Sequence, residues 1–247
     1  MRKQILIPVS LPAWAHDPLL NLKRKLIPSA PVMKNIEGER YVEWSFLTKE
    51  MPNGPGKAMD FGCENGFIGL IAAEKGFHVL AVDLEHQSFC FEHPNMEFRQ
   101  GDFLEMPLRE GYFDLILNCS SVEHVGLVGR YGIKAERTHG DVETLQRFAQ
   151  ILKPEGLVLM TAPCGRDALL APWCRVYGEQ RLPSLLAPFS VEKERYWQKD
   201  ERNRWIEVDR KQALNFQTRH DPDNPHGCSY ALGGFVLRKT ARSRHSS

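Results

Sequence analysis

The stretch Lys57–Glu85 has the sequence KAMDFGCENGFIGLIAAEKGFHVLAVDLE and decides the fold. A short apolar run, Ala58–Phe61, leads into a tight glycine-containing segment, after which apolar residues recur at helical spacing until Gly76. A second apolar run, Phe77–Val82, ends at Asp83. Strand, glycine loop, helix, strand and acid in this order predict a right-handed βαβ unit that holds a nucleotide-like ligand.

Each part of this unit has a physical task. Small residues after the first strand let backbone N–H groups approach a ligand, and the start of the helix offers unpaired donors. Asp83 lies 21 positions after Gly62, close to the spacing of roughly 20 at which a carboxylate accepts from ribose hydroxyls. The segment fits G-x-G-x-x-G poorly, which disfavours a nicotinamide site. An α/β domain that binds nothing in this crevice stays open as an alternative.

The glycine segment resembles a known family. Asp60–Gly66, DFGCENG, is similar to the D-x-G-x-G-x-G loop of class I S-adenosylmethionine (SAM)-dependent methyltransferases. Glu64 stands at the middle glycine position, so its side chain must point away from the ligand or reach the ligand's ammonium group. Further segments match the same family in the right order: Asp83, Gly101-Asp102-Phe103, Phe113-Asp114-Leu115-Ile116 and Leu152-Lys153-Pro154-Glu155-Gly156.

The resemblance covers Lys57–Ala162 and implies an α/β fold. It would be a Rossmann-like, doubly wound, mostly parallel sheet with an antiparallel last strand and helices on both faces. The implied cofactor is SAM, with Asp83 on its ribose, Asp102 on the adenine amino group and the next backbone N–H on the ring. The implied cofactor-binding residues are Asp60, Gly62, Cys63, Glu64, Gly66, Asp83, Leu84, Gly101, Asp102, Phe103, Asn118 and Cys119.

Bulk composition narrows the classes of partner. The 247 residues suit one large α/β domain, and 32 basic against 31 acidic residues leave a net charge of +1. No global field would attract nucleic acid or an anionic membrane. We therefore expect a small-molecule substrate, no nucleic-acid partner and no membrane partner, and we leave a homodimer open.

The N-terminus and the cysteines favour a cytoplasmic protein. Pro8 and Pro12 break an apolar run that is too short for an ordinary signal peptide, and no other stretch approaches transmembrane length. The six cysteines are scattered without a C-x-x-C pair. This favours reduced thiols over disulfides or a thiolate zinc site.

The sequence predicts two regions. Residues 1–56 would form an N-terminal arm and a helix, Glu39–Lys49, that covers the site, and residues 57–247 the methyltransferase domain. Within the domain we expect an insertion at about 164–207 that covers the substrate. The C-terminal third would contain helices at Arg175–Leu186 and Asp209–Phe216 and strands at Val191–Gln198 and Ala231–Arg238.

Ser120–Gly132, SSVEHVGLVGRYG, follows the fourth predicted strand, where this class places residues around the methyl group. Together with Arg175–Leu182, RVYGEQRL, it also resembles a poorly characterised branch of methyltransferase-like proteins, often associated with bacterial glycan or secondary-metabolite genes. That second resemblance carries no established chemistry.

Methyl transfer is an in-line displacement, so the protein aligns the acceptor and removes its proton where it carries one. His124 is the best general base by type, because an imidazole pKa near ~6.5 suits proton removal at neutral pH. His139 is the competing candidate, and Glu123 could orient His124, although adjacent residues usually diverge. His124 could equally brace the loop, and Arg130 and Tyr131 could be surface positions.

The predicted function is methyl transfer from SAM to O or N of a small organic acceptor, such as a sugar or natural-product intermediate. A protein or RNA methyltransferase is an alternative, although Asn118-Cys119-Ser120-Ser121 lacks the Asn-Pro-Pro-Tyr pattern of base methylation. A non-catalytic SAM-fold partner protein, suggested by Glu64, is an alternative of another class. His220–His226 collects metal-type ligands, but proline-broken Asp/Asn runs are typical of turns, so no metal is expected.

Overall fold

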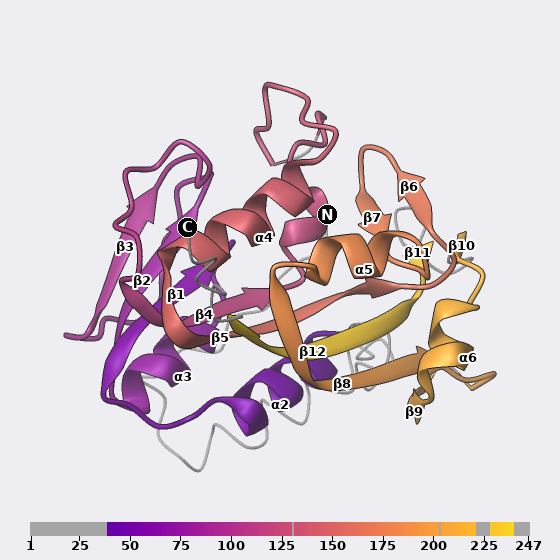
Figure 1. Ribbon diagram of the computed structural model, residues 1–247, viewed down its shortest axis with the longest axis horizontal. Helices are drawn as coiled ribbons and strands as arrows, with labels where there is room; N and C mark the ends of the chain where they lie inside the picture. The colour runs from indigo at the N-terminus through magenta and orange to yellow at the C-terminus, as the bar shows by residue number, and fades with distance from the viewer. Residues whose placement is uncertain (1–38, 130, 203, 221–227, 240–247) are drawn as a thin grey trace, which may run out of the picture. The chain divides into compact units, whose positions relative to one another are not determined.

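The protein is described by a computed structural model, in which residues 39–129, 131–202, 204–220 and 228–239 are placed. Its centre is an eight-stranded sheet with the order β3-β2-β1-β4-β5-β12-β8-β9 (Figure 1). The strands are β1 (Gly56–Phe61), β2 (Phe77–Asp83), β3 (Met96–Gln100), β4 (Phe113–Cys119), β5 (Leu152–Cys164), β8 (Phe189–Lys199), β9 (Trp205–Val208) and β12 (Ala231–Lys239).

The direction of the strands confirms the predicted fold class. The pairs β3–β2, β2–β1, β1–β4 and β4–β5 are parallel. The last strand, β12, is antiparallel to both of its neighbours, β5 and β8, and β9 pairs antiparallel with β8 at the edge. The sheet is therefore mostly parallel with an antiparallel last strand, as the sequence predicts.

Helices cover both faces of this sheet (Figure 1). Helices α2 (Arg40–Glu50) and α3 (Ile68–Glu74) lie on one face, and α4 (Gly140–Ile151) and α5 (Arg181–Leu186) on the other. The buried residues of helix α6 (Arg210–Leu214) pack in the same hydrophobic cluster as those of α4. The short elements are η1 (Val122–His124), β6 (Ala168–Leu170), β7 (Cys174–Val176), β10 (Arg219–His220) and β11 (Cys228–Ser229).

The two faces carry separate hydrophobic cores, because side chains alternate along each strand. In β4, Leu115 and Leu117 pack in the cluster with α2 and α3, whereas Ile116 packs in the cluster with α4. On the α4 side, the rings of Phe61, Phe103 and Phe148 pack edge to face, with centroids 5.0–5.3 Å apart. Each such pair contributes about 0.5–1.5 kcal/mol beyond its buried area. Both cores hold the strand ends that form the site.

The predicted helix Arg175–Leu186 is wrong in its first half. Residues Cys174–Val176 form strand β7, and helix α5 begins only at Arg181. The carboxylate of Asp167 accepts the backbone N–H groups of Gly178 and Arg181, at 2.8 and 3.0 Å, and so holds a turn between strand and helix. A Cβ at Gly178 would lie 2.6 Å from the carbonyl oxygen of Gly165, so this turn requires glycine.

The predicted cover at residues 164–207 is divided in the structure. Its first part forms the β6–β7 hairpin and α5, whereas Phe189–Lys199 is β8, a strand of the main sheet paired with β12. The predicted strands Val191–Gln198 and Ala231–Arg238 are confirmed, and so is a helix within Asp209–Phe216. The edge strand β9, Trp205–Val208, was not predicted.

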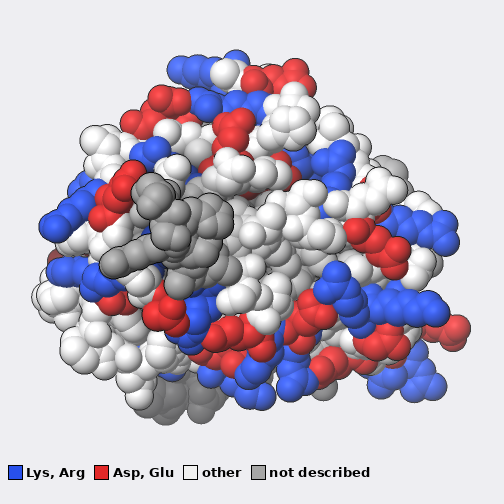
Figure 2. All heavy atoms as spheres, in the orientation of Figure 1, with Lys and Arg blue, Asp and Glu red and all other residues white. Residues whose placement is uncertain are grey.

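The visible surface carries charges of both signs. Figure 2 shows Lys and Arg side chains interspersed with Asp and Glu side chains over the visible face. Among the residues that the structure places, no helix is both long enough and apolar enough to cross a membrane. The predicted arm at residues 1–37 lies outside the described residues.

Candidate functional site

The candidate site lies at the carboxyl ends of β1, β2 and β4. Strand β1 pairs with β2 on one side and with β4 on the other, so the direction in which strands are added reverses between β1 and β4. In open α/β sheets, ligands bind in the crevice outside the strand ends at such a switch point. The glycine segment Gly62–Gly66 follows β1 directly and therefore lies at this crevice.

The glycine loop is fixed between β2 and the segment after β4. Gly62 has φ +62°, and a Cβ there would lie 2.5 Å from both Cβ and Oγ of Ser121. The Ser121 hydroxyl donates to the carbonyl oxygen of Gly62 at 3.1 Å, and the Gly62 N–H donates to the carbonyl of Val82 at 2.9 Å. Glycine is required here because the chain turns left-handed against a neighbouring side chain.

Asp83 holds the tip of this loop. One of its carboxylate oxygens accepts the backbone N–H of Glu64 at 2.9 Å, and the other accepts that of Glu85 at 3.0 Å. Glu64 has φ +46°, a left-handed conformation that costs an ordinary residue about 1–2 kcal/mol. Its side chain is exposed, 3.8 Å from the guanidinium of Arg40. The backbone at Glu64 therefore has a conformation that glycine usually adopts, and the hydrogen bond to Asp83 stabilises it.

Asp60 supports the same loop from beneath. It is buried at the end of β1, and its carboxylate accepts the Gly69 N–H in the first turn of α3 at 2.9 Å. Burial raises the pKa of Asp60 to about 7, the Gly69 N–H lowers it and the charge of Asp83 raises it further. A Cβ at Gly69 would lie 2.8 Å from that carboxylate. The Asp60 side chain thus faces α3 and aligns the helix with the strand.

The remaining residues of the glycine loop and of the end of β2 are placed as follows. Cys63 is buried, and burial raises the pKa of its thiol, which makes it a weak nucleophile. Gly66 closes the turn through a bond from its N–H to the carbonyl of Cys63 at 3.0 Å. Leu84 is exposed just after β2. These residues contribute mainly backbone groups to the turn.

The segment after β3 offers a carboxylate and backbone groups. The Gly101 N–H donates to the carbonyl of Asp83 at 2.8 Å, which ties the ends of β3 and β2 together. Asp102 is exposed, and its carboxylate accepts the N–H of Leu104 at 2.9 Å. The ring of Phe103 is buried and packs on Phe61 in the aromatic cluster.

Asn118 and Cys119, at the end of β4, connect that strand to its surroundings. The Asn118 amide donates to the carbonyl of Thr161 at 3.2 Å and accepts the Val122 N–H at 3.0 Å, which joins β4, β5 and η1. The carbonyl of Cys119 accepts from Arg40 at 3.4 Å. Both residues therefore act as braces at the rim of the crevice.

A buried acid on α2 was missed by the sequence analysis. Glu43 is 0% exposed and pairs with Arg40 at 2.9 Å. The same carboxylate accepts the hydroxyls of Ser120 and of Thr161, the latter at 2.7 Å, at the ends of β4 and β5. One signal was available: Glu43 shares a helical stripe with the buried Phe46, so an acid occupies an apolar position.

Glu123 and His124 follow β4 in the short helix η1. Glu123 is 1% exposed, and its Oε2 has no hydrogen-bond partner among the described residues. Its Oε1 lies 3.8 Å from Nε2 of His124, an ion-pair distance but too long for a hydrogen bond. Burial raises the pKa of Glu123 well above its usual value, and the charge of Glu43 raises it further.

The contact of Nδ1 with a backbone carbonyl defines the orientation of the His124 ring. Nδ1 lies 2.5 Å from the carbonyl oxygen of Trp173, and a carbonyl can only accept, so Nδ1 carries the proton. In the neutral ring the lone pair is therefore on Nε2, on the side of Glu123. The ring packs on Tyr131, with centroids 5.0 Å apart.

His139 is placed separately from this pair. It is exposed at the N-cap of α4, where its carbonyl accepts the N–H of Glu143 at 2.9 Å. Of the other loop residues named from the sequence, Tyr131 contacts His124, whereas Arg130 lies outside the described residues. The structure therefore brings Glu123 and His124 together and gives His139 a position in the helix cap.

The loop after β4 is braced by a buried arginine from β7. Arg175 is 1% exposed and donates to the carbonyls of Val125 and Arg137, at 2.7 and 3.0 Å. Its Nε lies 3.6 Å from the carboxylate of Asp141, which also accepts the Tyr177 hydroxyl at 3.1 Å. The RVYG sequence is thus a structural brace that fixes the loop carrying Glu123 and His124.

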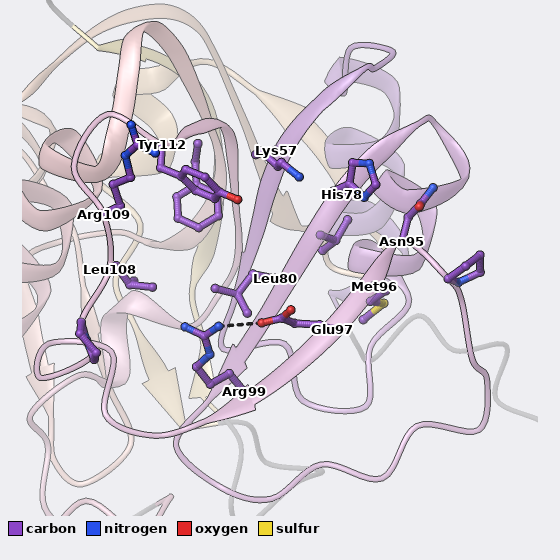
Figure 3. A pocket seen from close by; sticks show the side chains of 14 residues that line it. Lys57, His78, Leu80, Asn95, Met96, Glu97, Arg99, Leu108, Arg109 and Tyr112 are labelled. Atoms are coloured by element: carbon purple, nitrogen blue, oxygen red, sulfur yellow. Dashed lines mark hydrogen bonds and ion pairs between the residues drawn. The ribbon is translucent and has the colours of Figure 1, made fainter.

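A groove of about 390 Å³ lies at the opposite end of the sheet (Figure 3). It is lined by residues at the amino ends of the strands, among them Lys57, His78 and Tyr112. Glu97 and Arg99 form an ion pair of 2.7 Å in its wall. Since the glycine loop follows the carboxyl end of β1, this groove is separate from the candidate site.

The described residues contain no group of three or more His, Cys, Asp and Glu side chains that could hold a metal ion. Most of the His220–His226 run lies outside these residues. Among the cysteines with described side chains, Cys63, Cys90, Cys119 and Cys164 are free thiols.

Solved structures share this architecture. A 1,6-didemethyltoxoflavin N1-methyltransferase from Burkholderia thailandensis, with bound substrate and S-adenosylhomocysteine, is 17% identical with a TM-score of 0.52, over 96% of this chain and 94% of its own. The [4+2]-cyclase SpnF is 15% identical with a TM-score of 0.54, over 80% of each chain. At these identities the likeness shows the fold, which is that of class I SAM-dependent methyltransferases.

Sequence comparison gives relatives over part of the chain. YqeM of Bacillus subtilis, whose name assigns it provisionally to the methyltransferases, is 29% identical over 128 residues, which are 48% of this chain and 47% of YqeM. The chain thus spans about half the length of the curated relatives it matches. The family model DUF268, described as Caenorhabditis protein of unknown function, matches residues 95–221, just over half of the chain. The chain therefore belongs to the DUF268 family.

Proposed function

We propose that this protein is a SAM-dependent methyltransferase that transfers a methyl group to O or N of a small organic acceptor, such as a sugar or natural-product intermediate. The observation that carries the proposal is the contact between Asp83 and the N–H of Glu64, at 2.9 Å. It holds a glycine-type loop and a carboxylate together at the switch point, the arrangement that binds a nucleoside and its substituent.

The residues at the crevice fit SAM. Each carboxylate oxygen of Asp83 can accept a second hydrogen bond, so the ribose hydroxyls can bind there while the loop contact persists. Asp102 and the backbone of Phe103 would hold the adenine. The loop Gly62–Gly66 would hold the methionine part, with Asn118 and Cys119 at its side.

In this proposal SAM supplies a methyl group on a sulfonium, which an acceptor attacks in line. The protein aligns the acceptor and takes up its proton. His124 is the proposed base, because the Trp173 carbonyl holds its neutral ring in the tautomer with the lone pair on Nε2. Glu123 would orient or assist it across 3.8 Å, and His139 remains the competing candidate.

Other functions have weaker support. A protein or RNA methyltransferase would fit the same cofactor crevice, but the visible face carries interspersed charges (Figure 2). The cyclase SpnF has a similar fold, so the fold alone does not decide the reaction. A non-catalytic SAM-fold protein remains an alternative, and a cytoplasmic location and a homodimer remain predictions. The β6–β7 hairpin and α5, the part of the predicted cover that lies outside the main sheet, are proposed to close over the acceptor.

Calorimetric titration with SAM and with S-adenosylhomocysteine tests the proposal. Both ligands should bind one site per chain in the micromolar range, which corresponds to about 8 kcal/mol. The absence of binding by both would overturn it. Binding without methyl transfer to any acceptor in a metabolite extract would favour the non-catalytic alternative.

A further inference from the structure

Glu123 is a buried acid, and Nε2 of His124, 3.8 Å from its Oε1, can carry a counter-charge only when the imidazole is protonated. The Glu123 side chain is 2% exposed, and Oε2 has no hydrogen-bond partner among the described residues. Its backbone carbonyl is occupied by Arg175, at 3.3 Å, but that guanidinium pairs with Asp141 rather than with the Glu123 side chain. A buried acid normally has a partner, because an unsatisfied group in a dry environment costs several kcal/mol.

The charges that act on Glu123 from α2 do not compensate it. Glu43 and Glu39 raise its pKa, and Arg40 lowers it. Arg40 already pairs with Glu43 at 2.9 Å and approaches Glu64 at 3.8 Å, so its charge is shared among other acids. With Glu123 ionised, the region beside it has a negative potential. An added cation would be stabilised there and would offset the burial that raises the pKa of Glu123.

This negative region lies beside the point of methyl transfer in the proposed function. Ser121, two residues before Glu123, donates its hydroxyl to Gly62 in the glycine loop at 3.1 Å. Asn118 holds the start of η1 through the N–H of Val122 at 3.0 Å. Short contacts thus connect η1 directly to the loop that would hold the methionine part of the donor. An acceptor at the end of β4 would meet Glu123.

We propose that the methyl acceptor is an amine, which enters as its ammonium ion, and that Glu123 is the residue that binds this ammonium. The inference rests on the proposed function and deepens it. The ammonium loses one N–H proton to Nε2 of His124, and the nitrogen lone pair forms a bond to the methyl carbon as the carbon–sulfur bond breaks. The products are the N-methylated ammonium and S-adenosylhomocysteine.

A hydroxyl acceptor matches these residues less well. A neutral alcohol could donate a hydrogen bond to Oε2, but it would bring no positive charge into this group of buried acids before His124 takes up its proton. An ammonium supplies both the donor and the charge, and charge-assisted hydrogen bonds are roughly twice as strong as neutral ones. His124 then has a proton to accept from the same group, 3.8 Å from Glu123.

Sinefungin provides a probe of this position. It is a SAM analogue in which a carbon bearing an ammonium group replaces the methylsulfonium, whereas S-adenosylhomocysteine has a neutral sulfur there. The two compounds share the nucleoside and the amino-acid part, so their affinity ratio reports the environment of the transfer position alone. Calorimetry with the full chain should show sinefungin binding about tenfold or more tightly, as expected for one charge-assisted bond.

The variant Glu123→Gln should reduce that ratio to near one while the affinity for S-adenosylhomocysteine stays within about twofold. Glu97→Gln removes the same charge at the opposite end of the sheet and should keep the full preference (Figure 3). Glu123→Asp, which retains the charge, should keep part of it.

An equal affinity of the unmutated protein for the two compounds would overturn the inference without any variant, even if Glu123→Gln fails to fold. A preference that survives in a folded Glu123→Gln protein would also overturn it. Failure of both compounds to bind would instead overturn the proposed function.

Discussion

The two sides of the crevice are built in different ways. On the proposed cofactor side, Gly62, Glu64 and Asp83 belong to one βαβ unit, and their contacts are made largely by backbone N–H groups. On the proposed acceptor side, Glu123 and Arg175 belong to η1 and β7, which the fold brings together, and the contacts are made by the Arg175 side chain. A site built from local backbone leaves a motif in the sequence, whereas one built from distant side chains does not.

The largest expected effect concerns the brace of the acceptor side. Arg175→Ala should lower the free energy of unfolding by about 3–5 kcal/mol, because it removes one partner of a buried ion pair and leaves Asp141 uncompensated. Urea denaturation would measure this loss. Arg181→Ala, at an exposed side chain, should change stability by no more than about 0.5 kcal/mol.

A loss for Arg175→Ala as small as for the control would mean that the acceptor side is not held by this side chain. The statement that side-chain contacts hold this side of the crevice would then be wrong.

His124→Ala should affect turnover rather than cofactor binding. We expect kcat to fall by about 10²–10⁴-fold, the usual contribution of a positioned base, with SAM affinity nearly unchanged. His139→Ala, at the exposed cap of α4, should retain most of the rate. The methylated product would be quantified by mass spectrometry once an acceptor is available.

If His124→Ala weakened SAM binding as much as it slowed turnover, His124 would brace the loop that both sides share. Full turnover in that variant would place the base elsewhere.

Asp83→Ala should break the cofactor side alone. It removes a carboxylate that accepts two backbone N–H groups, and SAM affinity should fall by about 30- to 150-fold, or about 2–3 kcal/mol. Calorimetry would measure the change, with Asp200→Ala as the matched control, because the Asp200 carboxylate also accepts two backbone N–H groups. An unchanged SAM affinity in Asp83→Ala would refute the assignment of the ribose site.

The smallest expected effect comes from Glu64→Gly. The residue is left-handed at φ +46°, so glycine should relieve strain and raise the free energy of unfolding by up to about 1 kcal/mol. Thermal denaturation would detect a rise in the melting temperature of a few degrees. A clear decrease would show that the contact with Arg40 at 3.8 Å outweighs the strain.

The sequence was sufficient for the fold and for the turn that follows β1 at Gly62. The alternation of strands and helices follows from the spacing of apolar residues along the chain. The antiparallel last strand at Ala231–Arg238 follows from the family resemblance. The turn at Gly178 was missed, because the carboxylate of Asp167 that shapes it belongs to another part of the loop. The edge strand Trp205–Val208 was also missed, since it becomes a strand only by pairing with β8.

The acceptor side was predicted less completely. Glu123 and His124 were named, and Glu123 was considered as a group that orients His124. The tautomer of His124 could not be predicted, because it depends on a carbonyl 49 residues away. Glu43 was missed because a single acid in a helix is usually solvated. Its burial depends on hydroxyls at the ends of two distant strands.

A crystal structure with bound S-adenosylhomocysteine tests the central claim most directly. The account predicts the ligand over Gly62–Gly66, with the ribose hydroxyls within hydrogen-bond distance of Asp83 and the sulfur facing η1. A ligand bound elsewhere, for example in the groove at Lys57 and Tyr112, would contradict it, and so would a ribose that makes no contact with Asp83.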